Sequence, residues 1–226
     1  MTKKADSYQR REESLSRDRI IEASLALLDE SGESGLTFRA LSEKLATGPG
    51  AIYWHIESKS ELFTAAADAI ISRATAAPLA DATPEAAIRT LALGMFDAID
   101  AHPWIGSALS RAPGRPPMVR ILERMGQQVR ALGVQGDAQW EAVSVLLNYI
   151  LGVAGRNAAN GQFGRKHELD RTDFLNTIAM EWLQLDPDAY PFTRSIAHRM
   201  RTHDDRVDFL AGIDLILKGI SSTLTP

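Results

Sequence analysis

The chain has 226 residues, no cysteine, 45% hydrophobic residues and a formal net charge of −4. Its length suits one or two globular domains, and the missing cysteines exclude disulfides, thiolate metal sites and cysteine nucleophiles. The negative charge argues against a protein that coats nucleic acid indiscriminately, because such binding needs a basic surface.

The N-terminal part of the chain begins with a polar segment. Residues 1–15 are charged and lack apolar periodicity, so we expect a mobile arm. This segment contains no apolar core of the kind that a signal peptide needs, which favours a cytoplasmic protein. A first helix is expected from Ser16 to Ser31, with Ile21, Leu25 and Leu28 at helical spacing and Gly32 as its end.

The stretch from Leu36 to Phe63 predicts two short helices joined by a tight turn, with a capped third helix behind them. Apolar side chains from Phe38 to Leu45 recur at helical spacing. Pro49 suits the first turn of the next helix, which we expect from Pro49 to His55, because its φ is already helical. The tetrad Ser58-Lys59-Ser60-Glu61 is a capping box that starts the third helix.

This segment resembles the TetR family of bacterial transcriptional regulators, nearly position by position over residues 16–74. The resemblance implies an all-α protein. An N-terminal three-helix helix-turn-helix DNA-binding domain (residues 16–62) would follow the arm, and a larger helical bundle (63–226) would serve ligand binding and dimerisation. The chain departs from the family at Ala46 and Thr47, where Gly and Val are usual, and at Gly48, where a Ser or Thr usually caps the reading helix.

The resemblance also implies roles on DNA, with the second helix of the motif in the major groove. Small groups from Pro49 to Ala51 would face base edges, and Tyr53, His55 and Lys59 would bind phosphates. Arg39 has open roles: a guanine contact, or alternatively a phosphate contact or a solvated side chain. For Trp54, packing inside the helix-turn-helix domain, called the headpiece below, is the more frequent role of such a ring. The expected DNA-binding residues are Thr37, Arg39, Thr47, Gly48, Pro49, Gly50, Ala51, Tyr53, Trp54, His55 and Lys59. An arm of this kind either stays solvated or follows the minor groove.

The rest of the chain also shows helical patterns. We expect a helix from Thr83-Pro84 to His102-Pro103, a loop over Ser110–Pro117, a helix from Met118 that Gly133 closes, a helix from Asp137 as its cap to Asn157, and a last helix over Arg206–Ser221.

The last two of these helices are apolar on nearly every side, which favours burial against both their own domain and a second copy of the chain. A thick intramolecular core is the alternative. The longest apolar run, Ala142–Ala154, is too short to cross a membrane. The expected dimer-interface residues are Leu147, Leu151, Gly152, Gly155, Phe209, Ile213, Ile216 and Leu217.

The family resemblance further implies a pocket in the helical bundle, whose small-molecule effector releases DNA. The candidate pocket residues are Met95, Phe96, His102, Trp104, Met118, Leu122, Met125, Asn148, Tyr149 and Phe174. Most of these are core residues on the plainer interpretation. His102 and Asn148 need polar partners within apolar surroundings. The apolar bundle indicates a lipophilic or aromatic effector. Alternatively, Arg111 and Arg115 in the expected loop would bind an acidic effector.

Enzyme motifs are missing from the sequence: it has no GxGxxG, P-loop, GxSxG or HExxH pattern. We therefore expect no enzyme, no metal and no cofactor. The expected partners are a double-stranded DNA operator, a small-molecule effector and a second copy of the chain, with no membrane. A rival interpretation is a helical adaptor that uses the headpiece for protein contacts; it predicts that Tyr53→Phe and Lys59→Ala leave function intact. Repression is the family's usual mode, and the sequence does not separate it from activation.

Overall fold

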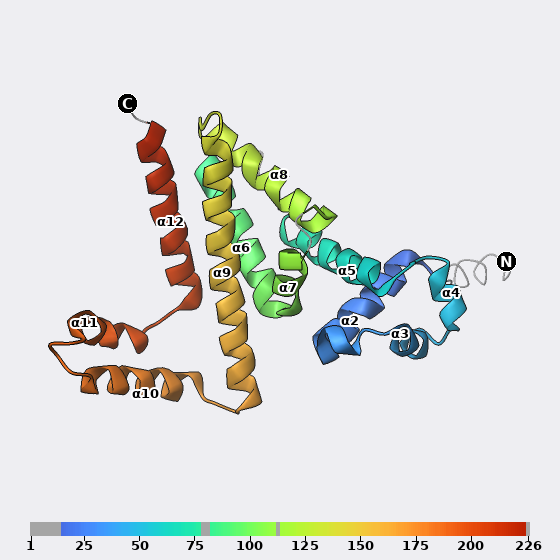
Figure 1. Ribbon diagram of the computed structural model, residues 1–226, viewed down its shortest axis with the longest axis horizontal. Helices are drawn as coiled ribbons and strands as arrows, with labels where there is room; N and C mark the ends of the chain where they lie inside the picture. The colour runs from blue at the N-terminus through green and yellow to red at the C-terminus, as the bar shows by residue number, and fades with distance from the viewer. Residues whose placement is uncertain (1–14, 78–81, 112–113, 225–226) are drawn as a thin grey trace, which may run out of the picture. The chain divides into compact units, whose positions relative to one another are not determined.

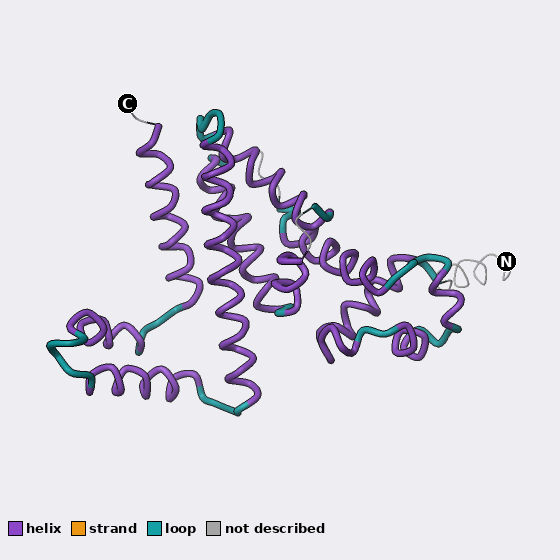
Figure 2. Tube along the Cα trace, in the orientation of Figure 1, coloured by secondary structure: helices purple, strands orange, loops and turns teal. Residues whose placement is uncertain are grey.

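The computed structural model of the chain describes residues 15–77, 82–111 and 114–224 (Figure 1). All regular secondary structure within these ranges is helical (Figure 2). The expected all-α class is therefore confirmed. The expected arm lies outside the described residues except for Leu15. In the described part of the chain, no helix is both long enough and apolar enough to span a bilayer.

The helices form two compact units. The first contains the described residues up to Ala76 together with His102–Leu122, and the second contains Ala77–Ala101 and the described residues from Glu123 onward. The boundary expected at residues 62 and 63 falls inside helix α5 (Lys59–Ala74), all of which belongs to the first unit.

The first unit is built on α2 (Arg17–Gly35), α3 (Phe38–Lys44), α4 (Pro49–Tyr53), α5 and α7 (Trp104–Arg111). Helix α2 packs against α3, α5 and α7, and α3 packs against α4. The core of the headpiece consists of fully buried aliphatic side chains, among them Ile20, Leu28, Leu36, Leu41, Ile52, Ile56 and Leu62. The apolar periodicity of the sequence thus does produce a helical headpiece with one continuous interior.

The second unit is centred on α6 (Pro84–Ala101), α9 (Ala138–Lys166) and α12 (Asp205–Leu224), which all pack on one another. Helix α10 (Arg171–Gln184) packs mainly on α11 (Pro191–Met200). Helix α8 (Pro116–Ala131) is divided between the units at Leu122.

Aromatic rings join the three central helices of the second unit. The ring of Phe209 on α12 is fully buried, 4.7 Å from the ring of Phe96 on α6 and 5.7 Å from the ring of Tyr149 on α9. The Tyr149 hydroxyl donates a hydrogen bond to the carbonyl of Phe209 at 3.1 Å, and burial raises the pKa of this phenol. Gly212 provides the space for Tyr149, since a Cβ at position 212 would overlap the phenol.

Several expected helix ends are confirmed and others are wrong. The backbone leaves the helical region at Gly32, with φ at 64°, and α6 begins at Pro84 and ends before His102. Helix α4 ends at Tyr53, not at the expected His55. The loop expected over Ser110–Pro117 is shorter, because α7 extends to Arg111 and α8 begins at Pro116.

Helix α9 departs furthest from expectation. It ends at Lys166 instead of about Asn157, and Asp137 stands at its start without a side-chain hydrogen bond to the helix. The backbone of Asp137 is already helical, with φ at −65° and ψ at −27°, which is not the extended conformation of a capping residue. The last helix is also longer than expected by a few residues, Asp205–Leu224.

Candidate nucleic-acid interface

The turn between α3 and α4 is short and backbone-bonded. Thr37 caps α3, its hydroxyl accepting a hydrogen bond from the Ala40 N–H at 3.0 Å. Ala46 adopts a left-handed conformation with φ at 49°, so this chain places a Cβ at the position where the turn favours glycine. The Thr47 N–H then donates to the Ser42 carbonyl at 3.0 Å, which closes the turn.

The start of α4 exposes small groups. Gly48, Pro49 and Gly50 are exposed, and Ala51 is half-buried. Apart from adjacent residues and the helix's own backbone, no described atom lies within 4 Å of the Cβ positions at Gly48 and Gly50, so the backbone here is open to a close partner. Pro49 occupies the first helical position as predicted, and Gly48 precedes it without a side-chain cap. This end of the helix can approach another backbone or a base edge closely.

Aromatic side chains surround the other end of α4. Tyr53 stacks on Phe38 of α3, with ring centroids 4.3 Å apart, and half of the tyrosine remains exposed. Trp54 is 90% exposed, so the interpretation that it packs inside the headpiece is wrong. The fully buried Ile52 and Ile56 take the core positions of this segment, which leaves the rings of Tyr53, Trp54 and His55 outside.

Arg17 of α2 bonds both the segment that follows α4 and the first turn of α5. The Arg17 guanidinium donates to the His55 carbonyl at 3.3 Å and to Glu61 Oε1 at 2.8 Å. The hydrogen bond from Arg17, followed by one from the Glu57 N–H, lowers the pKa of Glu61. The Ser58 hydroxyl accepts from the Glu61 N–H at 3.1 Å, while Glu61 Oε2 accepts from the Glu57 N–H at 2.8 Å instead of from Ser58. The capping box is thus present, shifted by one residue on its glutamate side.

Arg39 and Lys59 are exposed basic side chains of the first unit. The Arg39 side chain is 90% exposed, and within the described part of the chain its ion-pair partner is Glu43, one turn further on, at 3.0 Å. Lys59 Nζ donates to the Glu33 carbonyl at 2.7 Å. An exposed ion pair such as Arg39–Glu43 contributes about 0–1 kcal/mol, so exchanging it for a phosphate contact costs little.

The expected ligand-pocket residues do not gather in one unit. His102, Trp104, Met118 and Leu122 belong to the first unit, and the other six belong to the second. In the first unit, the side chains of His102 and Trp104 both contact Asp29 Oδ1, at 2.7 and 2.8 Å. The partner that His102 requires is therefore a carboxylate of the protein.

Within the second unit, Met95, Phe96 and Met125 are buried core residues. Tyr149 is occupied by its hydrogen bond to Phe209. Asn148 is exposed, contrary to the expectation that apolar neighbours surround it. Phe174 is the one residue of the expected pocket that lines a cavity described for this unit.

The expected dimer residues divide by burial. Leu147, Phe209, Ile213 and Leu217 are buried within one protomer, so their side chains serve its own core. Leu151, Gly152, Gly155 and Ile216 lie on half-buried or exposed positions. The same helices expose Val145 and Leu215, the latter by 68%, which sequence periodicity did not distinguish from the buried set.

No group of three or more histidine, aspartate and glutamate side chains in the described ranges is arranged to hold a metal ion.

Comparison with known proteins links both parts of the chain to one family. Residues 20–66 match the bacterial regulatory proteins of the tetR family, and residues 77–224 match the tetracyclin repressor-like C-terminal domain. Among solved structures, the transcriptional regulator SCO7222, a TetR from Streptomyces coelicolor, is 51% identical. The similarity covers 92% of this chain and 99% of that chain, with a TM-score of 0.85.

Two further relatives are more distant. The HTH-type transcriptional repressor DrrR1 of Streptomyces coeruleorubidus is 25% identical over 91% of this chain and 77% of its own length. The TetR family protein ActR of Streptomyces coelicolor, solved in complex with actinorhodin, is 20% identical over 91% of this chain and 95% of its own, with a TM-score of 0.74. At that identity, ActR supports the fold alone.

Proposed function

The chain belongs to the TetR family of bacterial regulatory proteins, and we propose that it is a repressor that binds a palindromic operator as a homodimer and leaves it when a small-molecule effector binds. The observation that carries this proposal is the exposed face of the helix-turn-helix. There, an open glycine backbone at the start of α4 lies on the same small motif as exposed aromatic and basic side chains.

On operator DNA, we propose that α4 enters the major groove with Pro49, Gly50 and Ala51 against base edges. Tyr53, His55 and Lys59 would bind phosphates, with Lys59 exchanging the Glu33 carbonyl for a phosphate oxygen. Arg39 would leave Glu43 for a guanine or a phosphate. Trp54, which is almost wholly exposed, would pack on the sugar-phosphate backbone.

The dimer is proposed to form through α9 and α12. Exposed apolar side chains such as Val145 and Leu215 on these two adjacent helices support this placement, because exposed apolar area on paired helices is stabilised by burial against a second copy. Gly152 and Gly155 would permit close approach of the helices. A two-fold dimer then presents two reading helices to the two halves of a palindrome.

Release by an effector is proposed from the second unit, which the chain carries in addition to a complete DNA-binding headpiece. DrrR1 is named a repressor and ActR was solved in complex with actinorhodin, and both span nearly the whole of this chain. The effector must bind the released state more tightly than the DNA-bound state, by about 1–3 kcal/mol in typical cases. We further propose that the protein has no enzymatic activity and acts in the cytoplasm, where bacterial operators lie.

The test is selection of bound sequences from a random duplex DNA pool by the purified full chain, at near-physiological salt. We expect an enriched two-fold palindrome whose affinity falls in Arg39→Gln and Lys59→Ala. Arg130→Ala is the matched control, since Arg130 is an exposed arginine on α8 outside the motif. A pool without enrichment would refute sequence-specific repression and favour the adaptor.

A further inference from the structure

The second unit contains a cavity that the residues of the expected pocket do not explain. It has a volume of about 490 Å³ and is lined mainly by the C-terminal half of α9 and by α10, with single residues from the ends of α6 and α11 and two from the start of α12 and the turn before it. This volume lies within the range of small-molecule sites, about 300–1,000 Å³. Of the ten residues expected in a pocket, Phe174 alone takes part.

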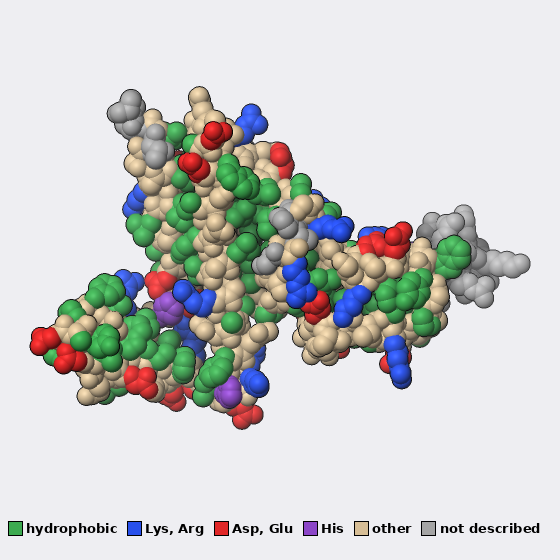
Figure 3. All heavy atoms as spheres, in the orientation of Figure 1, with side chains coloured by type: hydrophobic (Ala, Val, Ile, Leu, Met, Phe, Trp, Pro, Cys, Tyr) green, Lys and Arg blue, Asp and Glu red, His purple; other side chains and the backbone are tan. Residues whose placement is uncertain are grey.

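One side of the cavity is apolar and partly exposed. Phe163 is 52% exposed and Phe174 is 40% exposed, and Leu175 and Ile178 of α10 continue this wall. Figure 3 shows hydrophobic side chains gathered over α10 and α11. Apolar side chains on a concave surface release water when a ligand covers them, which favours an aromatic or alicyclic ligand.

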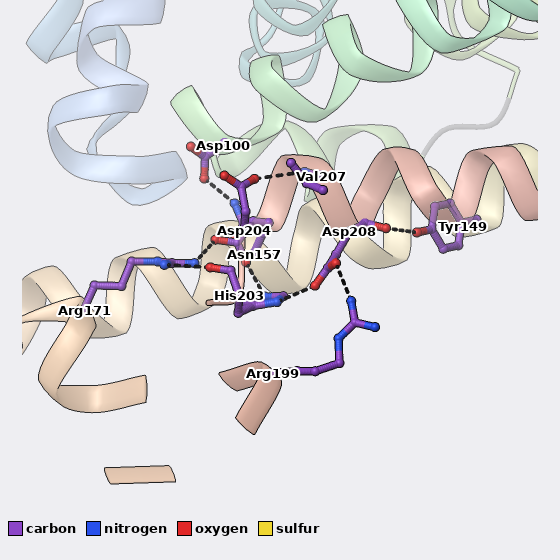
Figure 4. A network of polar contacts seen from close by, with 10 residues as sticks. Asp100, Tyr149, Asn157, Arg171, Arg199, His203, Asp204, Val207 and Asp208 are labelled. Atoms are coloured by element: carbon purple, nitrogen blue, oxygen red, sulfur yellow. Dashed lines mark hydrogen bonds and ion pairs between the residues drawn. The ribbon is translucent and has the colours of Figure 1, made fainter. Parts of the chain in front are cut away.

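A second set of lining residues, the polar wall, is held in place by hydrogen bonds (Figure 4). Arg171 donates to Asp205 at 2.6 Å and to the His203 carbonyl at 3.2 Å. The His203 ring lies between two carboxylates, with Nε2 at 2.9 Å from Asp205 and Nδ1 at 2.6 Å from Asp208. Asn157 donates to Asp100 at 2.8 Å. The polar wall is therefore preformed, as ligand sites usually are.

One cation among the lining residues has no carboxylate partner in the described part of the chain. Of the two carboxylates that line the cavity, Asp205 pairs with Arg171, whereas Asp100 accepts a hydrogen bond from the neutral amide of Asn157 and keeps its negative charge. Arg165 also lines the cavity and is exposed, and among the described residues it forms no ion pair. An unpaired guanidinium beside an apolar wall suits a carboxylate, sulfonate or phenolate group of a ligand.

We propose that this cavity binds an amphipathic organic anion, with its ring system on Phe163 and Phe174 and its anionic group on Arg165. The regulatory part of this inference rests on the proposed function. Because α10 packs mainly on α11, a ligand that contacts both α9 and α10 fixes this helix pair against the central bundle of the second unit. Such a ligand is an effector of the class that releases the operator.

The test uses two fluorescent probes of similar shape on the full chain: anilinonaphthalene sulfonate, an aromatic anion, and phenylnaphthylamine, which lacks the sulfonate. We expect one sulfonate probe per protomer and an affinity about tenfold lower in Arg165→Gln, corresponding to one charge-assisted hydrogen bond. Arg156→Gln, on the same helix but outside the cavity lining, should bind like the wild type. The neutral probe should bind Arg165→Gln and wild type equally.

Equal sulfonate affinities in Arg165→Gln and Arg156→Gln would overturn the proposal. The proposal would also be overturned if sedimentation showed a dimer for the wild type and a monomer for Phe174→Glu. A second copy of the chain would then cover the apolar wall of the cavity. Operator selection without any probe tests the proposed function separately. If the selection yields a palindrome but binding of the sulfonate probe does not depend on Arg165, the site alone is refuted. If probe binding depends on Arg165 but no palindrome is enriched, the repressor function is refuted, and with it the regulatory part of the inference.

Discussion

Ala46 is a non-glycine residue held in the left-handed region, in the turn between α3 and α4. Left-handed backbone costs an L-residue about 1–2 kcal/mol, and glycine avoids this cost while losing more entropy on folding. We therefore expect Ala46→Gly to raise the free energy of unfolding by about 0.5–1 kcal/mol in urea titrations. Ala40→Gly, in the helical backbone of α3, is the control and should lower it by a similar amount. A less stable Ala46→Gly protein would contradict this account.

Glu61 predicts a pH dependence for the headpiece. The Arg17 hydrogen bond, then that of the Glu57 N–H, lowers the folded-state pKa of this carboxyl below its unfolded value of about 4.3. Its contribution to stability is thus fully present above the unfolded pKa and is lost as pH falls through the folded pKa. Because Glu61 is about one-third exposed, this contribution stays below about 1 kcal/mol.

The measurement is thermal unfolding of wild type and Glu61→Gln between neutral and acidic pH. We expect the two stabilities to differ most at neutral pH and to converge as the solution is acidified. Glu57→Gln removes a neighbouring carboxylate whose side chain is not part of this hydrogen-bond set and should show less dependence. A gap that is constant over the whole pH range would show that the charge of Glu61 is irrelevant.

Single residues were also where sequence reasoning was least accurate. For Trp54, the interior position that large rings at helical spacing usually take is wrong, because Ile52 and Ile56 fill that interior. Arg17 of α2 joins the segment after α4 to α5 through contacts with His55 and Glu61, which lie 38 and 44 positions away in the sequence. A local pattern carries no signal for such contacts.

At the scale of helices, Gly212 controls how α12 approaches α9. A Cβ at this position would overlap the Tyr149 phenol, which burial and its hydrogen bond to Phe209 hold in place. We expect Gly212→Ala to lower the free energy of unfolding by about 1–3 kcal/mol, as overpacking usually does. Gly219→Ala on the same helix meets no atom within 4 Å and should stabilise the chain by about 0.5–1 kcal/mol through helix propensity.

A double variant tests the cause of this loss. If the phenol is the obstacle, Gly212→Ala should cost much less in a Tyr149→Ala background than in the wild type, which denaturant titration of the four proteins measures. Additive losses would place the strain elsewhere on α12.

Helix existence was predictable and helix ends were less so. Thr37, Pro49, Ser58 and Pro84 start helices through local chemistry, and each stands at the start of its helix in the structure. The end of α9 was misplaced because nothing stops a helix at Asn157: its side chain bonds Asp100 of α6, and the helix continues to Lys166. Tertiary contacts decide such ends.

At the scale of the whole molecule, the family could be recognised from the helix-turn-helix residues, whereas the ligand and dimer surfaces could not. Both α9 and α12 are apolar around most of their circumference, so the spacing of apolar residues does not show which face of each helix is buried. Only the packing of α6 against them separates Phe209 and Ile213, which are buried, from Leu215, which is exposed.

That separation defines a test of the dimer. Leu215→Arg places a charge on an exposed apolar position and leaves the core of the protomer intact, so we expect dissociation to a species near the chain mass of 24.7 kDa in sedimentation equilibrium. The wild-type unfolding temperature should rise with protein concentration, while that of the variant should not, because only a folded dimer gains stability by mass action. Val119→Arg, an exposed apolar position on α8, should leave both properties unchanged. If Leu215→Arg remains dimeric, the two-fold interface lies away from this face of α12, and the spacing of the two reading helices must be set by other surfaces.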